Sequence, residues 1–213
     1  MRISSLFTAL TGAISLSVAS PGMAQQANSM SDQASQVVMD LQARSISTLV
    51  VMDKARGEIL VVDQGNVVMR SPALYGKGVG ENEGADKNVT PAGIFALREY
   101  RDRHYDGGRV LAFICKPSMC YIIHPTWNGV PSERRNQRLA TATPVDNAIS
   151  NGCINVPYDF YRRMSDYLQS RAVTQGGVTS LPRLVVLPEN QDLAATRQIL
   201  GISGPAASNT PDP

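Results

Sequence analysis

The fold is decided early in the chain by the stretch TLVVMDKARGEILVVDQGNVVM, residues 48–69. It contains three short runs rich in Val, Ile and Leu, residues 48–53, 58–63 and 66–69, separated by Lys-Ala-Arg-Gly and Gln-Gly. Such runs favour strands, and the glycine-containing breaks favour tight turns between hairpin strands. The stretch therefore predicts the opening of an antiparallel sheet.

Similar strand-like runs follow at residues 94–98, 110–114, 121–124 and 183–187. Together they predict a mostly β domain, built as an antiparallel β-sandwich or sheet. One main helix is expected from Pro157, which suits a first-turn position, to the Gly176-Gly177 pair. An accessory helix is expected within residues 25–47, where apolar residues recur at helical spacing.

The two ends of the chain differ from this main domain, which we place at residues 48–190. Residues 1–24 have a positive start, an apolar middle and small residues at the end, which is typical of a secretory signal peptide. We expect a periplasmic or secreted protein without stable membrane insertion; an uncleaved membrane anchor is the alternative. Residues 191–213 are expected to form a largely disordered tail, with one or two helical turns before Gly201.

Charge and glycine content give little support to phosphate or nucleic-acid binding. The formal net charge is +2, too balanced to predict a nucleic-acid partner. The glycine-rich stretch 75–87 leads into another strand-like run rather than the helix that a phosphate-binding loop requires.

The chain has three cysteines, so at least one lacks an intramolecular partner. Cys115 and Cys120 flank Lys-Pro-Ser-Met between two strand-like runs, and a tight hairpin there would bring their sulfurs within bridging distance. Cys153 would then be the free thiol. Pairing of Cys153 with one of the other two cysteines is the alternative.

Cys153 lies in the segment ISNGCINVP, residues 149–157, which is suited to thiol chemistry. Acyl transfer by a thiol needs a proton acceptor and N–H donors for the developing oxyanion. Gly152 permits an unusual backbone geometry, and the Gly152 and Cys153 amides are candidate oxyanion donors. The helix starting near Pro157 is expected to lower the pKa of the thiol.

Two histidines are available as the base. His124 ends an apolar run and is followed by Pro125, which keeps it extended, whereas His104 lies in a polar turn and is expected to be solvated. A purely structural role for His124 is the alternative. A backbone carbonyl and Ser150 are both candidates for orienting its ring.

The order of these segments resembles the L,D-transpeptidases of the YkuD type, which are bacterial cell-wall enzymes. The similarity extends over residues 48–187 and rests on Tyr75-Gly-Lys, Thr90-Pro-Ala-Gly-Ile-Phe, His124 and the segment around Cys153. It implies that Cys153 forms a thioester with a peptidoglycan stem peptide, that His124 is the base, and that D-Ala leaves. It implies no metal and no organic cofactor.

Two positions depart from the family pattern. Asn151 stands where the family has His, and Asn155 stands where it has Arg. With Ser150 these residues are candidate substrate contacts, although Asn155 is equally suited to cap the following helix. Losing the arginine removes a cation that could hold the carboxylate of the substrate.

A third departure is the segment between His124 and Ser150, which is longer than the family spacing and forms an insertion. It contains Trp127, Arg134, Arg135 and Arg138, which could form a lid that supplies the missing cation. A solvated basic loop is the alternative.

Three functions fit these residues. The first is an L,D-transpeptidase, in which an amine resolves the thioester. An L,D-carboxypeptidase or hydrolase would use water at the same site. A non-catalytic cell-wall binding or assembly protein would retain the fold without the reaction. The sequence leaves the oligomeric state open.

Overall fold

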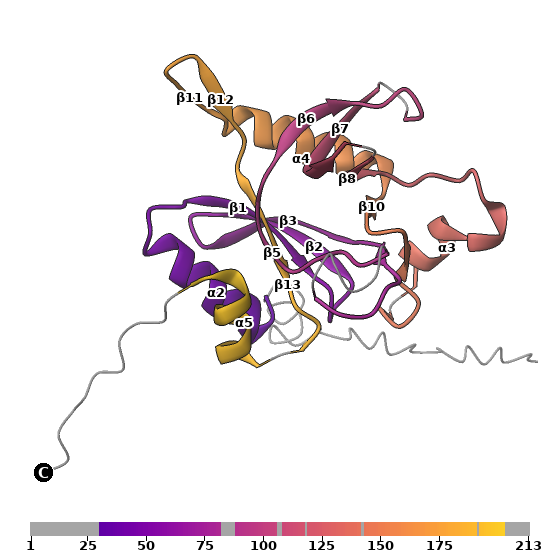
Figure 1. Ribbon diagram of the computed structural model, residues 1–213, viewed down its shortest axis with the longest axis horizontal. Coiled ribbons are helices and arrows are strands. Elements are labelled where there is room, and N and C mark those ends of the chain that lie inside the picture. The colour runs from indigo at the N-terminus through magenta and orange to yellow at the C-terminus, as the bar shows by residue number, and fades with distance from the viewer. Residues whose placement is uncertain are drawn as a thin grey trace, which may run out of the picture.

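A computed structural model describes residues 30–81, 88–105, 108–117, 119–141, 143–190 and 192–202 (Figure 1). The expected signal peptide, residues 1–24, lies outside the described residues, as does the tail from residue 203 onward. The fold is mostly β, as the strand-like runs predict.

The hairpin stretch forms one side of a five-stranded sheet, here called sheet A, with strand order β3-β2-β1-β13-β5. The early hairpins are confirmed: β1 pairs antiparallel with β2, and β2 with β3. The last strand returns to the centre of the sheet and pairs parallel with β1, so sheet A is mixed rather than fully antiparallel. The bounds are β1 (Thr48–Asp53), β2 (Glu58–Asp63), β3 (Asn66–Pro72), β5 (Gly93–Ala96) and β13 (Arg183–Leu187).

A second sheet, sheet B, has the order β10-β8-β7-β6. Its centre is the hairpin of β7 and β8, and β10 joins it parallel to β8. Two very short strands, β4 and β9, also pair parallel beside it. The bounds are β4 (Tyr75–Gly76), β6 (Arg98–Arg101), β7 (Arg109–Lys116), β8 (Met119–Pro125), β9 (Ala148–Ser150) and β10 (Ile154–Val156).

In the described part of the chain, three helices pack against the two sheets. The accessory helix is α2 (Asp32–Gln42), capped by the Ser31 side chain, which accepts from the Ala34 amide. The main helix is α4 (Tyr158–Ser170), shorter than expected because the chain turns back as the hairpin β11 (Val173–Gln175) and β12 (Val178–Ser180). The expected C-terminal turns form α5 (Leu193–Leu200), so the ordered chain continues through the first part of the expected tail.

Two cores divide the faces of sheet A. On one face, side chains such as Val50 and Met52 pack against sheet B and α4; on the other, Leu49 and Val51 pack against α2 and α5 (Figure 1). Alternating side chains of β1 are therefore buried on both faces, which accounts for its almost continuous apolar sequence. No helix among the described residues has the length and apolarity needed to cross a membrane.

Candidate active site

The Cys153 segment forms a tight turn between β9 and β10. At its centre Gly152 has φ +105, a conformation that side-chain-bearing residues rarely adopt. A Cβ there would lie 2.2 Å from Cε1 of Tyr121 and 2.8 Å from the Val89 carbonyl oxygen. Glycine is therefore required both by the backbone angle and by the close approach of β8.

Two short motifs of the sequence hold this turn from outside. The Thr90 hydroxyl donates to the Gly152 carbonyl at 2.9 Å and accepts from the Gly76 amide at 2.8 Å. The Lys77 amide donates to the Ser150 carbonyl at 3.0 Å. The Tyr75-Gly-Lys and Thr90-Pro segments thus support the Cys153 turn structurally.

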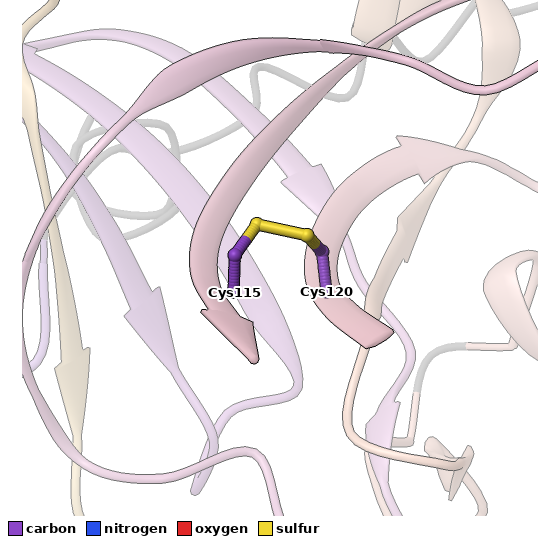
Figure 2. The surroundings of a disulfide bond; sticks show 2 residues. All are labelled: Cys115 and Cys120. Atoms are coloured by element: carbon purple, nitrogen blue, oxygen red, sulfur yellow. A yellow bond between two sulfur atoms is a disulfide. The ribbon is translucent and has the colours of Figure 1, made fainter. Parts of the chain in front are cut away.

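The cysteines divide as the local spacing predicts. Cys115 and Cys120 are joined by a disulfide across the β7–β8 hairpin, with a Cα–Cα distance of 4.1 Å (Figure 2). Cys153 is the free cysteine. It is partly buried and packs on the outer face of sheet B, against Val110, Ala112 and Ile122.

The expected lowering of the Cys153 pKa is wrong. Burial raises the pKa of the thiol above its ordinary value, although the Ile122 amide and the charge of Arg135 act in the opposite direction. The helix cannot dominate because β10 intervenes, and α4 begins only at Tyr158. The resting site therefore favours a neutral thiol.

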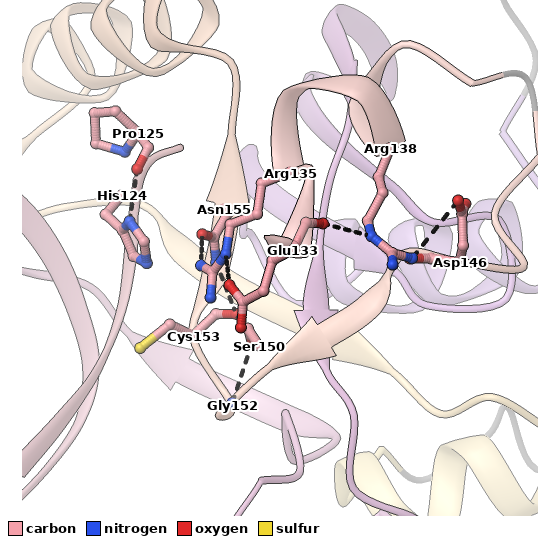
Figure 3. Close-up of polar contacts among 10 residues, drawn as sticks. All are labelled: His124, Pro125, Glu133, Arg135, Arg138, Asp146, Ser150, Gly152, Cys153 and Asn155. Carbon is pink, nitrogen blue, oxygen red and sulfur yellow. Dashed lines mark hydrogen bonds and ion pairs between the residues drawn. The ribbon is translucent and has the colours of Figure 1, made fainter. Parts of the chain in front are cut away.

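His124 lies at the end of β8, is 2% exposed and is paired with Asn155 of β10. Its Nδ1 lies 2.6 Å from the Pro125 carbonyl oxygen. Because a carbonyl can only accept, Nδ1 carries the proton and Nε2 has a free lone pair. The group that orients the His124 ring is therefore the Pro125 backbone carbonyl and not Ser150. Figure 3 shows the Cys153 sulfur pointing to the side of the site where the His124 ring lies.

Burial lowers the pKa of His124 to about 4. The ring is therefore neutral at physiological pH and can accept a proton at Nε2. The other histidine, His104, lies in an exposed turn, 2.7 Å from Asp102 through its Nδ1. It is not brought to the Cys153 turn, as its polar surroundings predict.

Ser150 organises the turn from within rather than contacting His124. Its hydroxyl donates to the Cys153 carbonyl and accepts from the Gly152 amide at 3.1 Å (Figure 3). The Gly152 amide, expected to be an oxyanion donor, is therefore occupied in this state. Of the two candidates, the Cys153 amide has no such partner among the described residues, and Asn151 lies exposed at the tip of the turn.

Tyr105 is a site residue that the sequence did not reveal. Its ring packs on His124 with centroids 4.3 Å apart and planes inclined by 44°. Like Cys153, it packs against the cluster on the outer face of sheet B, and burial raises its pKa to about 12. Tyr105 follows His104 in a polar turn, and the only signal was an aromatic residue in a turn that otherwise looked solvated.

The insertion brings one arginine to the site. Arg135 lies in α3 (Arg135–Leu139), is 9% exposed, and donates from Nη1 to the Asn155 Oδ1 and from Nε to Glu133 at 2.6 Å (Figure 3). The solvated-loop alternative is therefore wrong for Arg135. The helix-cap alternative for Asn155 is wrong as well, because Asn155 is a buried residue of β10 and Pro157 occupies the cap position.

The other members of the insertion have separate roles. Arg138 donates to the Glu133 and Asp146 carbonyls and stabilises the loop itself. Arg134 is exposed, and the half-exposed Trp127 ring lies 5.7 Å from the Arg135 guanidinium carbon. Across the described ranges, no cluster of three or more His, Cys, Asp or Glu side chains is arranged to hold a metal ion.

Comparison with solved structures returns L,D-transpeptidases at low identity. They include those from Mycobacterium smegmatis (20% identity, TM-score 0.40) and Mycobacterium tuberculosis H37Rv (13%, 0.42), and the E. faecium catalytic domain (16%, 0.42). Each alignment covers 67% of this chain, and 59%, 58% and 98% of those chains respectively. This chain thus spans about three fifths of the length of the two mycobacterial chains.

A search of curated protein sequences finds no match. The L,D-transpeptidase catalytic domain family named YkuD matches residues 47–175 of the 213. This match includes both His124 and the Cys153 turn and extends over more than half of the sequence. The chain therefore belongs to the YkuD family of L,D-transpeptidase catalytic domains.

Proposed function

We propose that this protein is an exported L,D-transpeptidase that acts on peptidoglycan stem peptides through a thioester on Cys153. The observation that carries the proposal is the combination of a free thiol with a buried imidazole whose unprotonated Nε2 is available. Membership of the L,D-transpeptidase family supplies the class of substrate.

The reaction begins from a neutral pair. As Cys153 Sγ bonds to the carbonyl carbon that precedes the terminal D-Ala, its proton passes to His124 Nε2. The oxyanion is held by the Cys153 amide. The C–N bond then breaks, the imidazolium returns the proton to the amine of D-Ala, and the thioester remains on Cys153.

A second amine completes the transfer. The acceptor amine attacks the thioester carbonyl and gives its proton to His124, and the thiolate that leaves takes the proton back. The product is a new amide between two stem peptides. Water at the same step would release a shortened peptide, which is the carboxypeptidase alternative.

Acylation of the thiol is the direct test. We expect a carbapenem, which acylates nucleophilic thiols in such sites, to add one adduct mass to the wild type and none to Cys153→Ala. His124→Gln should acylate much more slowly, by roughly the hundredfold or more typical of a lost general base. An equal adduct on Cys153→Ala would overturn the proposal.

Product analysis decides between transfer and hydrolysis. Purified protein incubated with disaccharide tetrapeptides should yield cross-linked dimers, or exchange D-Ala for an added D-amino acid. Tripeptide as the sole product would favour the hydrolase instead.

Export is the remaining part of the proposal, supported by the signal-like residues 1–24 and by the disulfide, which persists in oxidising compartments. We expect periplasmic or secreted protein whose amino terminus lies near Gln25, determined by fractionation and terminal sequencing. Full-length protein in the cytoplasmic fraction would contradict this.

A further inference from the structure

We propose that Arg135, delivered by the insertion between β8 and β9, binds the free terminal carboxylate of the donor peptide. This inference rests on the proposed function for the identity of the donor. It assigns a substrate contact to a residue outside the Cys153 segment.

The first support is position. The Arg135 guanidinium donates to the side chain of Asn155, and Asn155 Nδ2 lies 3.5 Å from the Cys153 carbonyl oxygen. The cation is thus two contacts away from the backbone of the nucleophile. In the donor, the terminal carboxylate is only one residue beyond the carbonyl that Cys153 attacks. A donor bound at Cys153 would therefore bring its carboxylate close to the Arg135 guanidinium.

The second support is that the guanidinium is held but not saturated. Among the described residues its hydrogen-bond partners are Glu133 and Asn155, which take two of its five N–H groups. The remaining N–H groups can form the paired hydrogen bonds by which arginine binds a carboxylate. A cavity of about 150 Å³ adjoins Arg135 and is lined by insertion residues between Asn128 and Gln137.

The third support is burial. Arg135 is 9% exposed, whereas surface arginines are normally solvated. Glu133 accepts from the Arg135 Nε and so orients the guanidinium. It belongs to the same insertion, and among the described residues it makes no contact with the Cys153 turn. A buried, oriented cation near the Cys153 thiol is therefore suited to bind the carboxylate of an anionic peptide.

The fourth support is Asn155 itself. Asn155 is a fully buried residue of β10, and its Oδ1 accepts from the guanidinium. The cation therefore reaches the site from α3, and a strand residue next to the Cys153 turn holds it.

Binding tests the inference without requiring turnover. In a Cys153→Ala background, calorimetry would compare a disaccharide tetrapeptide that ends in a free carboxylate with the same peptide as its terminal carboxamide. We expect the acid to bind about tenfold to a hundredfold more tightly, the range expected for a charged hydrogen-bond pair. Adding Arg135→Gln should remove this preference, while Arg135→Lys should retain part of it.

Arg138→Gln is the matched control, because Arg138 lies in the same helix but contacts only loop groups. It should keep the acid-over-amide preference. The preference is a ratio measured on one protein sample, so partial misfolding of a variant does not alter it. A preference that survives Arg135→Gln, or is absent from the Cys153→Ala parent, would overturn the inference.

Turnover separates this inference from the proposed function. If the wild type forms no acyl-enzyme but the Arg135-dependent preference is present, the proposed function fails and the inference stands as carboxylate binding. If the wild type is active and Arg135→Gln changes kcat/KM equally for both donors, the inference fails and the proposed function stands.

Discussion

The central residues of the site are neutral at rest because both are buried. His124 has its pKa lowered to about 4, and Cys153 has its pKa raised, so neither the imidazolium nor the thiolate is favoured before substrate arrives. In the proposed mechanism, proton transfer during attack generates the charged nucleophile only when an acyl group is in place. This burial affects both the stability of the protein at acid pH and the pKa of His124.

The first prediction concerns stability at acid pH. The pKa of His124 is about 4 in the fold against a model-peptide value of 6.5, so the unfolded chain binds more protons between these values. The stabilisation is complete above pH 6.5 and is lost as pH falls towards 4, by up to about 3 kcal/mol. Urea midpoints of wild type should fall more steeply over this window than those of His124→Gln. Parallel curves for the two proteins would contradict the assigned burial.

The second concerns Tyr105, whose ring packs on His124 and is expected to shield it from water. Tyr105→Ala should raise the pKa of His124 from about 4 towards its ordinary value, and the acid limb of kcat/KM should move upward with it. Tyr105→Phe keeps the ring and should change little. Ring-proton NMR can measure this directly, since the chain has two histidines and the exposed His104 serves as the reference. An unchanged pKa in Tyr105→Ala would rule out shielding.

At the scale of elements, the Cys153 turn is shaped by three segments that are distant in sequence. β9 and β10 deliver the two ends of the turn, β8 limits its space through Tyr121, and Thr90 holds its central carbonyl. The turn geometry therefore depends on the packing of sheet B as much as on its own residues.

Gly152→Ala tests this dependence. Its φ of +105 and the 2.2 Å approach of Tyr121 combine backbone strain with a clash, and we expect a loss of roughly 2–4 kcal/mol in the free energy of unfolding. Gly176→Ala is the matched control, because Gly176 has φ +59 with open space around it and should cost only about 1 kcal/mol. Urea unfolding measures both. Equal losses would show that the close approach has no energetic effect.

At the scale of the whole molecule, the sequence predicted correctly those elements whose bounds depend on neighbouring residues alone. β1, β2 and β13 have the predicted bounds because long aliphatic runs between turn residues define them without reference to distant segments. The short strands β4 and β9 were missed, since two or three residues become strands only through their pairing. The end of α4 was misplaced because the Gly176-Gly177 turn belongs to a hairpin rather than to a helix end.

The site divides in the same way. Residue type and local context indicated Cys153, Gly152 and His124 as candidates, and a hairpin of short span predicted the Cys115–Cys120 pairing. The contacts of Arg135 with Asn155 and of Tyr105 with His124 could not, because they join segments 19 or more residues apart whose approach is set by tertiary packing. Periodicity and local spacing carry no information about such contacts.

The covalent state of the whole chain gives the last prediction. With Cys115 and Cys120 bridged, denatured but unreduced protein should take up one iodoacetamide, and protein reduced beforehand should take up three. Peptide mapping should place the single label on Cys153. Native protein should label more slowly than denatured protein at the same pH, because burial raises the pKa of the thiol and only the thiolate reacts. Cys153→Ala should take up no label without reduction; a label on Cys115 or Cys120 would mean that Cys153 is bridged, and a bridged Cys153 could not serve as the nucleophile.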